Sequence, residues 1–408
     1  MTKLDGKTMD LVQQNIAELK KLFPEALTEG KIDFDRLRLL LSDEVDTGKE
    51  KYEFTWPGKS DCIRLTQQQS TGTLRLDKES SKEWDSTKNL YIEGDNLEVL
   101  RLLQKAYHRK VKMIYIDPPY NTGGDFIYKD DFRDNVKNYK EKTEQDMMAK
   151  PANSGRYHSD WLNMIYPRLL IAKNLMRDDG VIFVSVDNHE AYNLRLVMNE
   201  VFGEENFIDQ IVWKKRYQGA KEKFLASIHE YIMFYARNIE QLPPIYVPSS
   251  KEYLEKYYKY EDEKVKERGP FRTQPLEAGK SMDTRKNLVF AIPAPDESEI
   301  WPKRQWVWGK ERVFNSLENN ELDFTKSKDG TWSVSFKQYM KDESGDIRET
   351  KAFSIIHDVY TQHGTAEISE LFETKQVFPF PKPSKLLRKL LDIGLNREED
   401  CLVLDFFS

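Results

Sequence analysis

The sequence of 408 residues contains only two cysteines, Cys62 and Cys401. This scarcity excludes a disulfide framework and a metal site built from cysteine clusters. The six histidines show no spacing typical of metal ligands, so we expect no bound metal. No apolar run is long enough to cross a membrane, and the first residues, MTKLDGKTMD, lack the apolar core of a signal peptide. We therefore expect a globular, cytoplasmic protein without membrane contact.

A large excess of positive charge is also missing. The formal net charge is −6, which argues against a protein that coats nucleic acid nonspecifically. Local basic clusters are present nevertheless, each mixed with aromatic residues that suit phosphate and base contacts. The first cluster contains Lys214, Lys215 and Arg216, and the second contains Lys303 and Arg304. A solvated charged surface is the alternative interpretation of either cluster.

The length allows two or three domains, and the sequence pattern changes three times. Residues 1–88 form a polar leader with helical spacing at Met9–Leu22 and Phe34–Leu41. Residues 89–216 alternate apolar strands with amphipathic helices. Residues 217–358 are rich in proline and tryptophan and indicate an inserted, mixed α/β domain. Residues 359–408 return to the helix–strand pattern.

The alternation predicts an α/β fold with a parallel, doubly wound, Rossmann-like sheet. The expected strands are Leu90–Ile92, Val111–Ile116, Val181–Val186, Phe207–Trp213, Tyr231–Tyr235 and Cys401–Phe407. The expected helices are 96–107, 158–177, 189–202 and 384–391. Between the second strand and its helix lies a long polar loop, 121–157, and loops of this length inside a domain usually have a function.

The tetrapeptide Asp117-Pro118-Pro119-Tyr120 follows the apolar strand 111–116 directly. Two prolines stiffen the chain there, because each fixes φ and removes an N–H donor. The Asp117 carboxylate and the Tyr120 ring are therefore expected at the carboxyl edge of the sheet, where open α/β sheets bind ligands. Asp117 and the Pro118 carbonyl have the acceptors needed to hold an exocyclic amine, while Tyr120 stacks on its ring. An ordinary turn with a packed tyrosine is the alternative.

The flanking residues favour the functional interpretation. DPPYNTGGDF at 117–126, YIEGDNLEVL at 91–100, DDGVIFVSVDNHE at 178–190, FPFPKPSKLL at 378–387 and LVLDFFS at 402–408 occur in one order. With these blocks the chain resembles the amino-methylating DNA methyltransferases. The resemblance is strongest to the modification (Mod) subunits of type III restriction–modification systems, which belong to the β group.

The resemblance implies transfer of a methyl group from S-adenosylmethionine to the N6 amine of a flipped adenine in duplex DNA. Aspartate before the two prolines favours adenine, although cytosine is known in the family. Asp117, Pro118, Pro119 and Tyr120 would form the catalytic motif. Residues Asn121, Phe126 and Asp187 would shape the base pocket, with packing or loop capping as alternatives for the last two. The insert 217–358 would be the target recognition domain.

Two further segments would bind the cofactor. In the family, the segment containing Phe380, Lys382 and Ser384 lies beside the methionine moiety. Asp405 and Phe407 would begin a glycine-rich turn, and Asp95 matches a position that contacts the adenosine part. An N-cap for helix 96–107 is the alternative role for Asp95.

The resemblance also implies partners: double-stranded DNA, a second copy in a homodimer, and a restriction subunit with helicase and nuclease activities. Alternatives are an orphan adenine or cytosine methyltransferase, a DNA-binding remnant that no longer methylates, and an enzyme that methylates RNA or protein glutamine. The sequence stops at Ser408, where the glycine-rich turn would begin. It therefore resembles a C-terminally truncated methyltransferase with an incomplete sheet, and we expect residues 1–408 alone to bind S-adenosylmethionine weakly.

Overall fold

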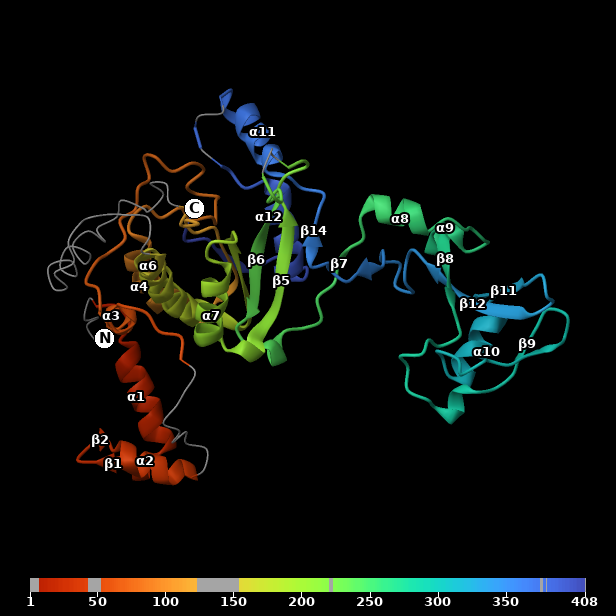
Figure 1. Ribbon diagram of the computed structural model, residues 1–408, viewed down its shortest axis with the longest axis horizontal. Helices are drawn as coiled ribbons and strands as arrows, with labels where there is room; N and C mark the ends of the chain where they lie inside the picture. The colour runs from red at the N-terminus through yellow and green to blue at the C-terminus, as the bar shows by residue number, and fades with distance from the viewer. Residues whose placement is uncertain are drawn as a thin grey trace. The chain divides into compact units, whose positions relative to one another are not determined.

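The computed structural model describes residues 7–42, 53–122, 154–219, 223–374, 377–378 and 380–407. The chain divides into two compact units, coloured along the chain in Figure 1. The first contains Met1–Ile245 and Phe353–Ser408, and the second contains Tyr246–Ala352.

The first unit is built on a six-stranded sheet with the order β14-β5-β6-β4-β3-β15. Its strands are β3 (Val111–Ile116), β4 (Met176–Val186), β5 (Phe207–Lys214), β6 (His229–Ala236), β14 (Ile355–Ile356) and β15 (Leu402–Leu404). β15, β3 and β4 are parallel neighbours, and β14 is parallel to β5. β6 runs antiparallel to both β4 and β5, so the expectation of a wholly parallel sheet is wrong. The reversal arises because β6 follows β5 without a crossover helix.

Helices cover both faces of this sheet, as expected for a doubly wound α/β fold. α4 (Asn96–Tyr107), α6 (Ser154–Leu175) and α7 (Ala191–Phe202) pack on one face, where Ile114 and Val184 belong to the buried core. α12 (Ser384–Leu395) contacts the opposite face of β3 and β4. A Cβ atom at Gly394 would lie 2.7 Å from the Met113 sulfur, so glycine permits this close approach.

The local predictions for this unit agree closely with the structure. The predicted bounds of β3 and α4 are confirmed without change. The predicted strand at Leu90–Ile92 is wrong, because these residues pair with no strand and both Leu90 and Tyr91 are exposed. A short apolar run has strand propensity, but a strand also needs a partner edge.

The N-terminal leader contributes α1 (Leu11–Leu22), η1 (Pro24–Ala26), β1 (Leu27–Thr28), β2 (Lys31–Ile32), α2 (Phe34–Leu41) and α3 (Lys59–Thr66). The two predicted helices are thereby confirmed. α3 is anchored on α6, since Trp56 Nε1 donates to Asn163 Oδ1 at 2.8 Å and Cys62 lies 3.2 Å from the same oxygen. Among the described helices, none is long and apolar enough to cross a membrane.

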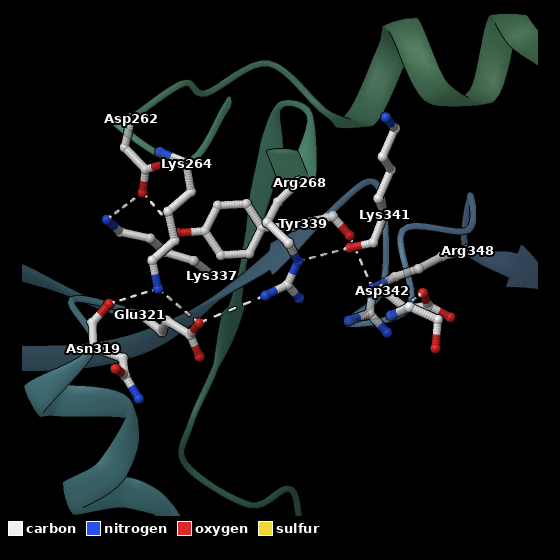
Figure 2. Close-up of polar contacts among 11 residues, drawn as sticks. Asp262, Lys264, Arg268, Asn319, Glu321, Lys337, Tyr339, Lys341, Asp342 and Arg348 are labelled. Atoms are coloured by element: carbon white, nitrogen blue, oxygen red, sulfur yellow. Dashed lines mark hydrogen bonds and ion pairs between the residues drawn. The ribbon is translucent and has the colours of Figure 1, made fainter. Parts of the chain in front are cut away.

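The second unit contains the three-stranded sheet β11-β12-β8, formed by β11 (Leu322–Lys326), β12 (Trp332–Tyr339) and β8 (Phe271–Pro275). The other elements are β7 (Val247–Pro248), α8 (Lys251–Tyr257), α9 (Val265–Arg268), η5 (Lys286–Leu288), β9 (Ile292–Pro293), β10 (Glu299–Ile300), α10 (Lys310–Glu318) and β13 (Glu349–Thr350). Trp306, Val313 and Val334 lie in its separate core. Two ion pairs lie beside this sheet (Figure 2). Lys337 Nζ is 2.7 Å from Asp262 Oδ2, and Lys264 Nζ is 2.9 Å from Glu321 Oε1.

This unit, Tyr246–Ala352, is shorter than the inserted domain 217–358 that we predicted from sequence composition. Residues 229–236 form β6, and residues 355–356 form β14 of the main sheet. The first unit also includes η3 (Glu204–Asn206) and η4 (Ile239–Gln241), and α11 (Thr361–Phe372) precedes α12. The segments that begin and end the second unit, here called its linkers, contain β7 and β13. These two strands pair in an antiparallel ribbon.

Candidate active site

The site lies at the carboxyl edge of the first unit's sheet, where Asp117 follows β3. Asp117 Oδ1 accepts a hydrogen bond from the Tyr120 hydroxyl at 2.8 Å. Asp117 Oδ2 is 2.6 Å from Lys382 Nζ, and this ammonium lies 4.9 Å from the centre of the Tyr120 ring. The structure therefore brings together two residues of the tetrapeptide and a lysine 265 positions later in the chain.

The loop that carries Asp117 is held on both sides. The Pro119 carbonyl accepts a hydrogen bond from Trp161 Nε1 at 2.6 Å. The next residue, Asn121, adopts a positive φ of 59° and donates from its side chain to Glu190. Glu190 is fully buried and also lies 2.6 Å from His158 Nδ1. The loop is thus preorganised by contacts to α6 and to the start of α7.

Glu230 is a site residue that sequence reasoning missed. It lies near the start of β6, 3.4 Å from the Tyr120 hydroxyl, and pairs with Lys215 at 2.7 Å. Its only sequence signal is an acidic residue directly before the run of aromatic and apolar residues 231–236. Desolvation, and then the charges of Asp117 and Glu230, raise the pKa of Tyr120 well above its usual value. Tyr120 is therefore a neutral donor to the carboxylates.

Asp405 follows the adjacent strand β15 and accepts a hydrogen bond from the Phe407 amide at 2.9 Å. Asp405 is exposed, yet desolvation by surrounding protein raises its pKa to about 6, and the nearby negative charge of Asp117 adds to this rise. The Phe407 amide opposes it. No cation pairs with Asp405 among the residues that the structure describes. This edge thus fits a ligand that carries positive charge, as the sulfonium and ammonium groups of S-adenosylmethionine do.

Asp95 is the N-cap of α4, and its side chain accepts the Glu98 amide at 2.9 Å. The alternative structural role is therefore present. Asp95 Oδ2 also lies 3.6 Å from a guanidinium nitrogen of Arg168, and the neighbouring Asn96 donates to the Phe406 carbonyl at 2.7 Å. These contacts connect Asp95 to the turn that follows β15.

The structure shows no hydrogen bond or ion pair with Asp117 for the other described residues that we expected at the site. Phe380 is exposed with a φ of 58°, and the Ser384 amide donates to Glu367 at 3.0 Å as the first residue of α12. Asp187 follows β4 at the same sheet edge and accepts from the backbone and ring of His189 at 2.9 and 2.8 Å. Phe126 lies outside the described residues.

The two basic clusters belong to different units. In the first unit, Lys215 is turned toward Glu230, while Lys214 Nζ lies 5.4 Å from the Tyr217 ring centre and Arg216 is exposed. In the second unit, Lys303 and Arg304 are exposed, and the Arg304 guanidinium donates to the Gly279 carbonyl. Each unit therefore contains one of the two predicted clusters.

This sheet edge combines the carboxylates of Asp117 and Glu230, the Tyr120 ring, and the ammonium groups of Lys215 and Lys382. A carboxylate offers about four lone-pair sites, so Asp117 retains acceptor capacity beside Tyr120 and Lys382. Within the described parts of the chain, no three His, Cys, Asp or Glu side chains are grouped to hold a metal. The arrangement suits binding of an amine on a planar ring.

Comparison with known proteins agrees with this geometry. A family model described as "DNA methylase" matches residues 111–408. The type III restriction–modification enzyme StyLTI Mod subunit of Salmonella typhimurium is 31% identical, covering 96% of this chain and 62% of that protein. The EcoP15I Mod subunit of Escherichia coli is 32% identical, covering 97% and 66%. The type II methyltransferase M.KpnI of Klebsiella pneumoniae is 28% identical, covering 79% and 75%. This chain spans less than two thirds of the length of these Mod subunits.

Proposed function

Because this chain belongs to the DNA methylase family, we propose that it transfers a methyl group from S-adenosylmethionine to the N6 amine of adenine in duplex DNA. The observation that carries the proposal is the joint position of Asp117, Tyr120 and Lys382 at the carboxyl edge of β3. Aspartate before the two prolines favours adenine over cytosine as the target.

The target amine must first leave the base stack, since these residues cannot reach it inside a duplex. Asp117 and the Pro118 carbonyl then accept its two N–H groups, which frees the nitrogen lone pair for attack. Hydrogen bonds to a charged acceptor are stronger than neutral ones, so Asp117 contributes most of this orientation. The Tyr120 ring stacks on the base. S-adenosylmethionine supplies the activated methyl group.

Lys382 and Asp405 have complementary tasks in this proposal. Lys382 neutralises Asp117 on the Oδ2 side, so the amine approaches the acceptor sites that remain. When the amine gains a methyl group it must lose one proton, and Asp117 is an acceptor within its reach. Asp405 holds a cationic part of the cofactor, and Asp95 contributes from the start of α4, where its neighbour Asn96 donates to the Phe406 carbonyl.

The decisive experiment is loss of Asp117. Asp117→Ala should reduce methyl transfer to duplex DNA on the order of 10²–10³-fold, the range for removing one oriented stabilising group. Duplex affinity should stay within a few-fold, since phosphate contacts dominate it. Labelled-methyl transfer and mass spectrometry of digested DNA check both the rate and the modified base. Equal loss of binding and transfer would contradict the role of Asp117, and label in RNA or protein but not in DNA would contradict the substrate.

We assign sequence recognition to the second unit. It contains a hollow of about 390 Å³, whose wall includes Arg312 and Asn315, two exposed residues of α10, and Asn319, which directly follows this helix. The Arg312 guanidinium lies 4.0 Å from the Trp308 ring centre. Arginine and asparagine read guanine and adenine edges, and the acidic Glu311 and Glu343 in the same wall argue against a purely phosphate-binding surface.

As partners we propose a second copy of the chain and a restriction subunit, by analogy with the Mod subunits that it matches. The cytoplasm, where the DNA substrate is found, is the proposed location. Co-purification with a restriction subunit encoded beside this protein tests the assembly. An orphan methyltransferase would methylate DNA without such a partner.

A further inference from the structure

Arg168 is a buried guanidinium that the chemistry at Asp117 does not use. It lies in α6 and is 3% exposed. Its Nε donates to Asn96 Oδ1 at 2.6 Å, and one terminal nitrogen donates to the Met164 carbonyl at 2.8 Å. The other terminal nitrogen lies 3.6 Å from Asp95 Oδ2. One side chain therefore contacts both residues at the start of α4.

The connection continues from Asn96 to the end of the main sheet. Asn96 accepts from Arg168 through Oδ1 and donates through Nδ2 to the Phe406 carbonyl at 2.7 Å. The Arg168 guanidinium also lies 5.9 Å from the Phe407 ring centre. α6 thus connects two segments that are 310 residues apart in the sequence.

The chemistry of this bridge fits a positioning role. A buried charge is costly to keep unless its hydrogen bonds are satisfied, and a guanidinium presents its donors in fixed directions. The contact to Asp95 is longer than a direct hydrogen bond, and the Asp95 side chain is still 46% exposed. Arg168 therefore orients Asp95 without consuming its capacity to meet a ligand.

We propose that Arg168 is a positioning residue for the cofactor, which fixes Asp95 and the 405–407 turn so that S-adenosylmethionine contacts both. The inference rests on the proposed function, because it takes these two segments as the cofactor site. It predicts a defect in cofactor binding that is separate from methyl transfer, since neither Asp117 nor Tyr120 contacts Arg168.

The test compares Arg168→Met with Arg101→Met in the full chain. Arg101 is a matched control: it lies in α4, its side chain is 11% exposed, and it bonds Glu98 and the Leu65 carbonyl instead of the cofactor segments. Arg168→Met should raise the Kd for S-adenosylmethionine about 10- to 100-fold, the range for lost hydrogen bonds to a charged group. The kcat at saturating cofactor and the affinity for duplex DNA should stay within about threefold, whereas Arg101→Met should leave the cofactor Kd unchanged.

Two milder variants keep the test valid if Arg168→Met fails to fold. Arg168→Lys keeps the charge beside Asp95 and should give an intermediate Kd. Asn96→Asp keeps the acceptor for Arg168 but removes the donor to the Phe406 carbonyl, and it should also raise the Kd.

Several results would overturn the inference. A cofactor Kd within threefold of the unmodified protein in Arg168→Lys and Asn96→Asp would do so, as would equal effects of Arg101→Met and Arg168→Met. If Arg168→Met lowered kcat by the same factor as it raised the KM for S-adenosylmethionine, the role of Arg168 would be generally structural. Absence of methyl transfer to DNA by the unmodified protein would contradict the proposed function; this outcome is distinct from failure of the inference, because the cofactor Kd values are measured without DNA.

Discussion

Tyr120 combines two contributions that are separable because its hydroxyl and its ring serve different purposes. Its hydroxyl donates to Asp117, whereas the proposed role of the ring is to stack on the target base. Tyr120→Phe should therefore keep base capture and reduce transfer modestly. Tyr120→Ala should also weaken capture, because stacking contributes about 1–3 kcal/mol per base. A fluorescent adenine analogue at the target position measures capture, and normal extrusion by Tyr120→Ala would argue against stacking.

Asp405 gives the site a pH dependence with a definite sign. Its pKa is raised from 3.8 to about 6, so folding favours the protonated carboxyl. The stabilisation from this group is complete below about pH 4 and is lost as the pH rises through about 6. Asp405→Asn should therefore increase thermal stability at about pH 7 and have little effect at about pH 4, which calorimetry can measure. A constant difference across this range would exclude titration of Asp405 as the cause.

Cofactor affinity should change with pH in the opposite direction. The ionised form of Asp405 is the one that attracts a cation, so the Kd for S-adenosylmethionine should rise as the pH falls below about 6, by up to about tenfold per unit. In Asp405→Asn the affinity should be lower and nearly independent of pH in this range. Titrations between about pH 5 and 7 decide the point, and an unchanged pH profile in the variant would remove Asp405 from the cofactor site.

At the scale of elements, the pair Lys215–Glu230 joins the end of β5 to the start of β6 next to the active site. Both side chains are largely buried, at 19% and 9% exposed. Lys215→Met should destabilise the first unit by about 3–5 kcal/mol, because it leaves Glu230 buried without its cation. Chemical denaturation measures the change. Adding Glu230→Gln should recover much of the loss, and failure to recover it would mean that Lys215 stabilises the hairpin through packing.

The elements also show which features the sequence encodes locally. β3 and α4 were predicted with correct bounds because Asp117-Pro118-Pro119 ends the apolar run and Asp95 caps the helix. The direction of β6 depends on its partner strands and has no signal within its own residues. The strand predicted at Leu90–Ile92 failed for the same reason, since no edge pairs with it.

The same distinction applies to the site. The tetrapeptide was predicted from the apolar strand and the two prolines that follow it, and Lys382 from the family resemblance; the structure places Asp117 and Lys382 together. Glu190, Glu230 and Arg168 were missed, although all three are buried and bonded to site segments. In the sequence each is one charged residue among many, and its partners become apparent only after the chain has folded.

At the scale of the whole molecule, recognition and chemistry are assigned to different units. Exchanging Tyr246–Ala352 for the equivalent unit of a relative should change which sequence is methylated and leave the methylated atom the same. The paired linkers β7 and β13 make these bounds suitable for exchange. Genome-wide mapping of modified bases measures the outcome. An exchanged protein that still methylates the original sequence would place recognition in the first unit.

The position of this insertion also affects how the chain folds during synthesis. β3, β4, β5 and β6 are complete by Ala236, but β14 begins at Ile355 and β15 at Leu402. At about 5–20 residues per second, a ribosome needs roughly 6–24 s to translate the interval of about 120 residues before β14. During that time the outer edges of β3 and β5 have unpaired backbone groups, which are the usual starting points for edge-to-edge aggregation. Until β14 and β15 are synthesised, a nascent chain of this architecture therefore exposes both edges of a four-stranded sheet.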